Sequence, residues 1–115
     1  MFSLTSTHQY YLYSSPTDMR GGFDSLCGIV RNKLERNPTC GEVYVFFNRR
    51  RNQVKLLHWE NGGFVLYWKR LEKGNFEIPV ITEGCLEWPK LVMIIEGVSL
   101  KNVTMRKRYL LKKGA

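Results

Sequence analysis

The stretch VYVFFNRRRNQVKLLHWENGGFVLYWKRL, residues 43–71, decides the fold. It holds three runs rich in valine, leucine and aromatic residues, which favour β-strands, separated by two polar turns. The second turn contains Asn61 and Gly62, a pair that readily adopts the positive φ angles of a tight type I′ hairpin. The first turn, residues 49–52, begins with three arginines. We therefore predict an antiparallel meander with strands at residues 42–48, 54–60 and 64–71.

The two turns also predict which residues face each other across these strands. Side chains alternate between the two faces of a sheet, and both faces of this meander are apolar. Each face therefore needs a cover. Helices of the chain can cover one face, and the C-terminal segment or another protein chain can cover the other. The alternative in which the same chain covers both faces is favoured. The predicted pairs are Trp59 with Phe64, Leu57 with Leu66, Lys55 with Trp68, Phe47 with Val54, Val45 with Leu56 and Phe46 with Lys55.

Helical spacing flanks the meander on both sides. Apolar residues at positions 23, 26, 27, 30 and 34 lie on one face of a helix, which Thr17 or Asp18 could cap. A second helix opens at Trp88 and Pro89 and stops at Gly97. A short aromatic strand is expected at residues 9–13, and a loop is expected around Gly84 and Cys85.

The expected fold class is therefore α+β. Residues 1–100 form one small domain, in which two helices pack on an antiparallel sheet of three to four strands or more. Residues 101–115, the basic tail, carry six basic residues and no acidic one.

The net charge of +8 is concentrated in two places. Four basic residues lie between positions 49 and 55 and six in the basic tail, so the rest of the chain is net acidic. Concentrated positive charge suits a polyanion such as nucleic acid, although a solvated turn and a solubilising tail explain it equally well. The N-terminus lacks the pattern of a signal peptide and no apolar run is long enough for a membrane span. We expect a cytoplasmic protein without membrane contact.

The sequence offers little catalytic chemistry. Its two histidines, His8 and His58, are far apart and have no neighbouring nucleophile, and His58 is expected inside the sheet. The cysteines at positions 27, 40 and 85 show no C-x-x-C spacing and are expected to be reduced. We expect no enzyme activity, no cofactor and no metal site.

The segment TDMRGGFD, residues 17–24, allows two interpretations. Arg20 and the glycines at a helix start could bind an anion. Alternatively, Gly22 allows helix and sheet to approach closely while Asp18 caps the helix or pairs with Arg20. The second interpretation is favoured.

Several blocks of the chain, taken in order, resemble one family. The blocks are TDMRGGFDSL, VYVFFNRR, KLLHWENGG, YWKRLEKGNF and IIEGV, which lie between residues 17 and 98, and the resemblance as a whole covers residues 9–98. They resemble TnpB, the small accessory protein of the insertion-sequence-66 transposable elements. The resemblance implies a helper in transposition, encoded beside a separate transposase that holds the catalytic residues. It carries over no catalytic residue. The positions that match basic positions of the family are Arg20, Arg49, Arg50, Lys69 and Arg70.

Two hypotheses follow for the function. The first is a non-catalytic accessory protein that contacts DNA at the element ends, with the transposase as a second partner. The second is a protein–protein adaptor without nucleic acid of its own, and a homo-oligomer is compatible with either. Single-stranded nucleic acid stacked on the aromatic residues is a third interpretation. The nucleic-acid candidates are Arg20, Arg49, Arg50, Arg51, Lys55, Lys69, Arg70, Arg106, Lys107 and Arg108, and the partner-interface candidates are Phe46, Trp59 and Trp68.

Overall fold

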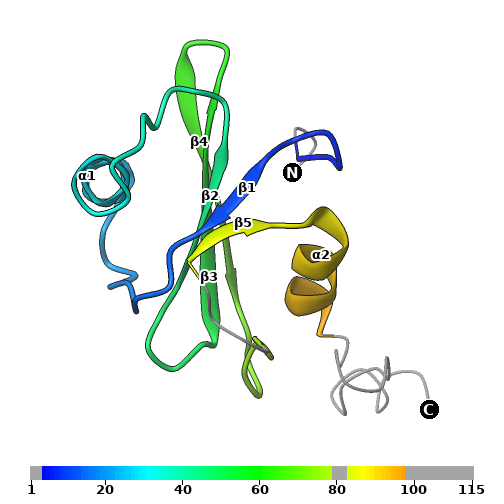
Figure 1. Cartoon of the computed structure of the whole chain (residues 1–115). Helices are drawn as coiled ribbons and strands as arrows, with labels where there is room; N and C mark the ends of the chain where they lie inside the picture. Colours follow the sequence, from blue (N-terminus) through cyan, green and yellow to red (C-terminus); the bar gives the residue numbers. More distant parts are fainter. Residues whose placement is uncertain (1–3, 79–82, 98–115) are drawn as a thin grey trace.

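The structure is a computed structural model that describes residues 4–78 and 83–97. Within these residues the fold is a five-stranded mixed sheet with two helices, and the strand order is β4-β3-β2-β1-β5. The two helices lie on opposite sides of the sheet (Figure 1). In chain order the elements are β1 (Tyr10–Leu12), α1 (Phe23–Asn32), β2 (Val43–Phe47), β3 (Gln53–Glu60), β4 (Gly63–Arg70), β5 (Gly84–Leu86) and α2 (Trp88–Glu96).

The predicted meander forms the centre and one edge of the sheet. Strands β2, β3 and β4 pair antiparallel, and every residue pair predicted from the two turns is confirmed. Asn61 and Gly62 have φ angles of 49° and 84°, as the tight turn between β3 and β4 requires. Local sequence patterns were sufficient here because each strand pairs with the next one along the chain.

The remaining two strands, β1 and β5, correct the prediction of a purely antiparallel sheet and of a loop around Gly84 and Cys85. β1 pairs with β2 in parallel, because α1 carries the chain back across the sheet between them. β5 occupies the segment around Gly84 and Cys85, where a loop was expected, and pairs antiparallel with β1. Three residues of mixed character give almost no strand signal, so this pairing depends on the tertiary structure.

Each face of the sheet has its own core, and the chain's own helices cover both. On one side α1 contributes Leu26 and Val30, which pack with Tyr44, Phe46 and Leu57 of the sheet. On the other side α2 packs on the alternate residues of the same strands. The favoured expectation, that the same chain covers both faces, is therefore confirmed, and α2 supplies the second cover. The α2-side cluster contains Val43, Val45, Phe47, Val54 and Leu56 from the sheet, and Leu91, Ile94 and Ile95 from α2.

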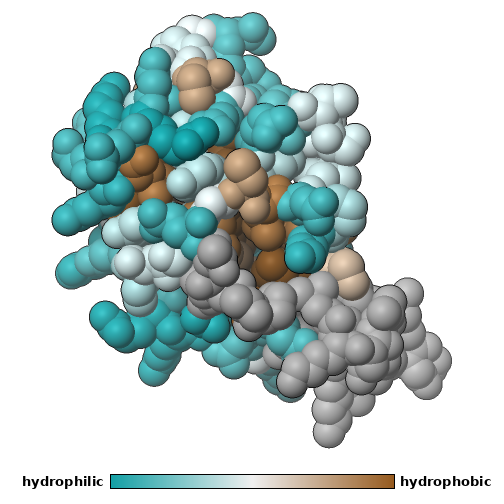
Figure 2. Space-filling view, in the orientation of Figure 1, coloured by the Kyte–Doolittle hydropathy of each residue, from teal (hydrophilic) through white to brown (hydrophobic). Residues whose placement is uncertain are grey.

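The surface of this molecule is mostly hydrophilic in the view of Figure 2, with an apolar area near the middle of the face shown. No helix among the described residues is both long and apolar enough to cross a membrane.

The helix ends were predicted in part. Gly97 ends α2 with a φ angle of 83°, as expected for a left-handed C-cap. The N-cap of α1 is Gly22, and no side chain caps that helix, so neither Thr17 nor Asp18 has the predicted capping role. Gly22 also has open space around it, whereas a side chain at Gly21 would collide with Ser25. The predicted close approach of helix and sheet at Gly22 is therefore wrong, and the tight contact at Gly21 is with α1 itself.

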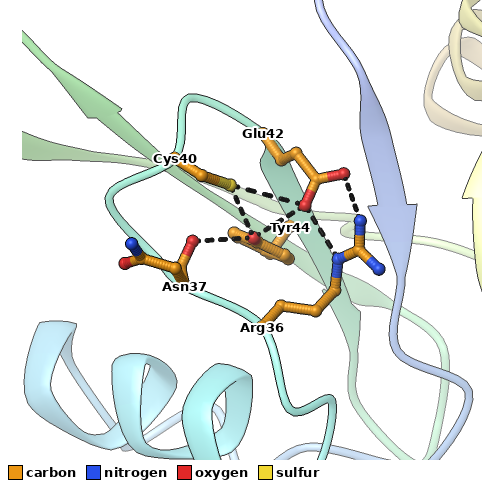
Figure 3. A network of polar contacts seen from close by, with 5 residues as sticks. All are labelled: Arg36, Asn37, Cys40, Glu42 and Tyr44. Atoms are coloured by element: carbon orange, nitrogen blue, oxygen red, sulfur yellow. Dashed lines mark hydrogen bonds and ion pairs between the residues drawn. The ribbon is translucent and has the colours of Figure 1, made fainter.

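A polar network fixes the connection between α1 and β2 (Figure 3). The Arg36 guanidinium donates two hydrogen bonds to the Glu42 carboxylate, at 2.8 and 2.7 Å, and lies 4.3 Å from the Tyr11 ring centroid. The Tyr44 hydroxyl lies 2.9 Å from a Glu42 oxygen and 3.1 Å from the Asn37 carbonyl. Hydrogen bonding from Arg36 lowers the pKa of Glu42, and burial raises the pKa of Tyr44. The network holds the chain that delivers β2 to the sheet.

Candidate nucleic-acid interface

The arginine turn, residues 49–52, is a rigid connection between β2 and β3. The Asn48 side chain accepts hydrogen bonds from the backbone N–H groups of Asn52 and Gln53, each at 3.0 Å. The Arg51 N–H donates to the Asn48 carbonyl at 3.0 Å. Arg51 itself has a φ angle of 58°, a conformation that glycine and asparagine adopt more readily. The turn is therefore held in one shape by its own polar groups.

Arg49 and Arg50 project from this turn into solvent. Both residues are exposed, and within residues 4–78 and 83–97 no carboxylate forms an ion pair with either. Arg51 is half-buried. The side-chain amide of Asn75 donates to the Arg50 carbonyl, which joins the turn to the segment after β4. The tip thus presents two uncompensated guanidinium groups on a fixed backbone.

Arg20 is exposed as well, but its charge is compensated. Its side chain donates to both carboxylate oxygens of Asp18, with the shortest contact at 2.6 Å. These bonds hold the pKa of Asp18 at about 2, below its ordinary value. The predicted pairing of Asp18 with Arg20 is confirmed, and it leaves this segment without a free cation.

Lys55 does not belong to a basic surface. The residue is 2% exposed, and its ammonium donates to the carbonyls of Met19 and Gly21 at 2.7 Å each. It also lies 4.0 Å from the Trp68 ring centroid. Burial lowers the pKa of Lys55. Its inclusion among the nucleic-acid candidates is therefore wrong. The side chain ties the loop before α1 to the sheet and cannot reach a phosphate.

The basic positions on β4 are also engaged. The Lys69 ammonium donates to the Ile95 carbonyl at 3.0 Å, near the end of α2, where a positive charge stabilises the helix. Arg70 is exposed and bonds to Glu72 at 3.1 Å. Arg106, Lys107 and Arg108 lie outside the described residues. The structure therefore leaves the exposed Arg49 and Arg50 and the half-buried Arg51 as the cations without an ion pair among the described candidates.

The three aromatic candidates lie in different environments. Phe46 is 0% exposed and packs in the core below α1. It offers no surface to a partner, so its prediction as an interface residue is wrong. Trp59 is half-buried and packs edge-on against Phe64 at 4.9 Å between ring centroids. Trp68 is 55% exposed on β4, an edge strand, and its ring nitrogen donates to Gln53 at 2.8 Å. Trp68 is the accessible one of the three.

His58 lies inside the sheet, as expected. It is buried, and its ring meets the His8 ring edge-on at 4.7 Å between centroids. Burial, followed by the neighbouring His8, lowers the pKa of His58. In the part of the chain that the structure describes, no three histidine, cysteine or acidic side chains gather as metal ligands would.

Comparison with known proteins identifies the relatives of this chain. Residues 8–105 match the family described as IS66 Orf2-like protein. The chain belongs to the IS66 Orf2-like family. The match spans the meander, both helices and the start of the basic tail, and it agrees with the resemblance seen in the sequence blocks. Membership associates the chain with the transposition of an insertion sequence.

Two proteins of Sinorhizobium fredii are similar to this chain. The uncharacterized protein y4jC is 33% identical over 73 residues, which cover 64% of this chain and 62% of the relative. The uncharacterized protein y4hO is 34% identical over 76 residues, which cover 66% of each chain. The matched region therefore spans just under two thirds of each relative. No solved structure matches this chain.

Asn48 is a site residue that the sequence interpretation missed. It directly follows β2, and its side chain accepts the hydrogen bonds that fix the arginine turn. An asparagine four residues before a second asparagine in a short hairpin loop is a usable signal, because asparagine side chains commonly bond the backbone of turns. The sequence interpretation considered the charge of the three arginines and not the asparagine that positions them.

Proposed function

We propose that this IS66 Orf2-like chain is a non-catalytic accessory protein of a bacterial insertion sequence that contacts DNA at the element ends, beside a separate transposase. The observation that carries the proposal is the arginine turn. Arg49 and Arg50 are exposed, uncompensated within the described residues and mounted on a hairpin fixed by Asn48.

The physical argument concerns charge and rigidity together. Guanidinium groups bond phosphate oxygens in a forked geometry, and each neutralised phosphate releases counterions from the DNA. A rigid hairpin tip loses little conformational entropy when it binds. Because β2 and β3 are inner strands of the sheet, the turn at the end of this hairpin is the part that can reach the DNA backbone.

A binding titration across salt tests this function. Full-length protein is titrated into duplex DNA that carries the element end, at salt concentrations from about 50 mM upward, where phosphate contacts dominate the affinity. Replacing Arg49 and Arg50 by glutamate should weaken binding at low salt and flatten the salt dependence.

The matched control replaces Lys33 and Lys90, exposed residues near the two helices, by glutamate and so makes the same change in net charge. The control should bind far better than the turn variant. Negligible affinity of the wild-type protein at about 50 mM salt would refute the DNA-contact function.

A second candidate function, a protein–protein adaptor, is favoured by Trp68. A tryptophan that is 55% exposed on an edge strand is the type of residue that anchors protein interfaces. Co-purification with the transposase should then be lost in Trp68→Asp and kept in Lys90→Glu. Retained co-purification with a folded Trp68→Asp variant would exclude this surface.

A further inference from the structure

The strongest unassigned feature is a groove at one end of the sheet, next to the arginine turn. It has a volume of about 290 Å³. One wall is formed by the segment after β1, including Ser14 and Ser15, and the other by the residues after β2, including Arg49 and Arg51. We propose that this groove binds one backbone phosphate of DNA. This inference rests on the proposed function and specifies which group of the DNA the groove would bind.

The position of the groove follows from the parallel pairing of β1 and β2. β1 ends at Leu12 and β2 ends at Phe47, so both walls leave the carboxyl ends of neighbouring parallel strands. In open α/β sheets, ligands bind outside the carboxyl ends of the parallel strands, and the β1–β2 pair presents the same ends to the groove. The antiparallel strands of the meander create no such crevice.

Two backbone hydrogen bonds join the walls on either side of the groove. The Tyr13 N–H donates to the Val45 carbonyl at 3.0 Å, and the Thr17 N–H donates to the Phe47 carbonyl at 2.8 Å. Residues 14–16, between these two anchors, stand away from β2 and leave the groove open. A site that is shaped before binding costs less to occupy than one that must be ordered by its ligand.

The groups available to a ligand are two guanidiniums and one hydroxyl. Arg49 and Arg51 line the groove from the turn, and the Ser15 hydroxyl has no hydrogen-bond partner among the described residues. Ser14 is engaged, since its hydroxyl donates to the Glu83 carboxylate at 3.2 Å. The Asn48 side chain is engaged by the turn. Two cations and a hydroxyl match the charge and the acceptor oxygens of a phosphodiester.

The conformation of Arg51 supports a functional role for its side chain. Its φ angle of 58° is one that glycine adopts without cost. The backbone also bonds at this residue on both sides, through its N–H to Asn48 and through its carbonyl, which accepts from the Phe76 N–H at 2.6 Å. Among the described residues the Arg51 side chain forms no ion pair, and strained residues of this kind gather at binding sites.

The test compares Arg51→Gly with Arg31→Ala in full-length protein, using the same element-end duplex. Arg51→Gly should keep or raise the melting temperature, because the turn accepts glycine, and should weaken DNA binding about tenfold at low salt. The slope of log affinity against log salt should fall by about one phosphate contact. Arg31, an exposed arginine on α1, should change the affinity by less than about twofold when replaced. If the glycine variant does not fold, Arg51→Asn replaces it in the same test, because asparagine also adopts positive φ angles readily.

Two further variants examine the serine wall. Ser15→Ala should weaken DNA binding by a few fold, since it removes the free hydroxyl. Glu83→Gln should tighten binding, because it removes a negative charge beside the groove and keeps an acceptor for Ser14. Wild-type affinity in both Arg51→Gly and Ser15→Ala would overturn the groove as the phosphate site and leave the DNA-contact function standing.

Titration with inorganic phosphate separates this inference from the proposed function. Amide resonances of residues 14–16 and 48–51 should shift on addition of phosphate, in wild type and not in Arg51→Gly. Such shifts without any affinity for DNA would overturn the proposed function and DNA as the source of the phosphate, and would leave the groove as a site for phosphate from another source. Phosphate shifts that are spread over the basic surface and unchanged in Arg51→Gly would overturn the groove.

Discussion

Replacing Lys55 by methionine should lower the free energy of unfolding by about 2–4 kcal/mol. The substitution removes two hydrogen bonds of 2.7 Å from the ammonium to the carbonyls of Met19 and Gly21. Hydrogen bonds to charged groups contribute about 1.5–3 kcal/mol each. The contact with Trp68 adds about 0.5–1 kcal/mol, the range for exposed sites, because that ring is 55% exposed. Against these gains stands the cost of burying the ammonium, which also lowers its pKa.

Urea unfolding at neutral pH measures the effect, with Lys73→Met as the control. Lys73 is exposed, so its replacement should change the stability by less than about 0.5 kcal/mol. A double-mutant cycle with Trp68→Leu should give a coupling of about 0.5–1 kcal/mol. Because Lys55 faces the interior, Lys55→Met should leave the salt slope of DNA binding unchanged.

A loss below about 0.5 kcal/mol for Lys55→Met would refute the reasoning. It would mean that the two carbonyls find water once the ammonium is gone, and that other contacts hold the loop before α1. A flattened salt dependence of DNA binding in a folded Lys55→Met protein would also contradict the reasoning, because it would mean that Lys55 contacts a phosphate.

Three further predictions concern stability. Gly62→Ala should cost about 1–2 kcal/mol, because Gly62 has a φ angle of 84°, whereas Gly63→Ala, with open space and no positive φ, should change little; thermal melts compare the two. Glu42→Gln should lower the stability by about 1–3 kcal/mol in urea unfolding, since a neutral amide cannot replace the doubly bonded carboxylate beside Arg36. Burial keeps the pKa of His58 below its ordinary value, so below about pH 6.5 the unfolded chain binds a proton that the folded chain does not. Stability should therefore fall as the pH drops from 7.5 to 5.5, and His58→Gln should reduce that fall.

The meander and both helices could be predicted from the sequence because their signals are local. Asn61 and Gly62 define one turn, strand alternation then determines the register, and Gly97 marks the end of α2. The parallel pairing of β1 with β2 left no such signal. It depends on the path of α1 across the sheet, which no short stretch of residues encodes.

The candidate site shows the same division. The charge of Arg49 and Arg50 and their position in a turn correctly predicted that both residues are exposed. Lys55 was misjudged because it is basic and adjacent to the arginines, while its burial depends on the Met19 and Gly21 carbonyls more than thirty residues earlier in the chain. Phe46 was misjudged because alternation assigns a face but not its cover. In both cases the missing information is the position of α1 and the loop before it.

The position of β1 has a consequence for the order of folding. Tyr10 pairs with Val43 on one side and with Leu86 on the other, so this early strand is completed by the last strand of the described sheet. The meander closes through short loops and can form first, whereas the slot for β1 requires the closure of long loops. During synthesis the outer edge of β1 therefore stays unpaired until residues 84–86 have been made, and premature release of the chain would leave an open strand edge for aggregation.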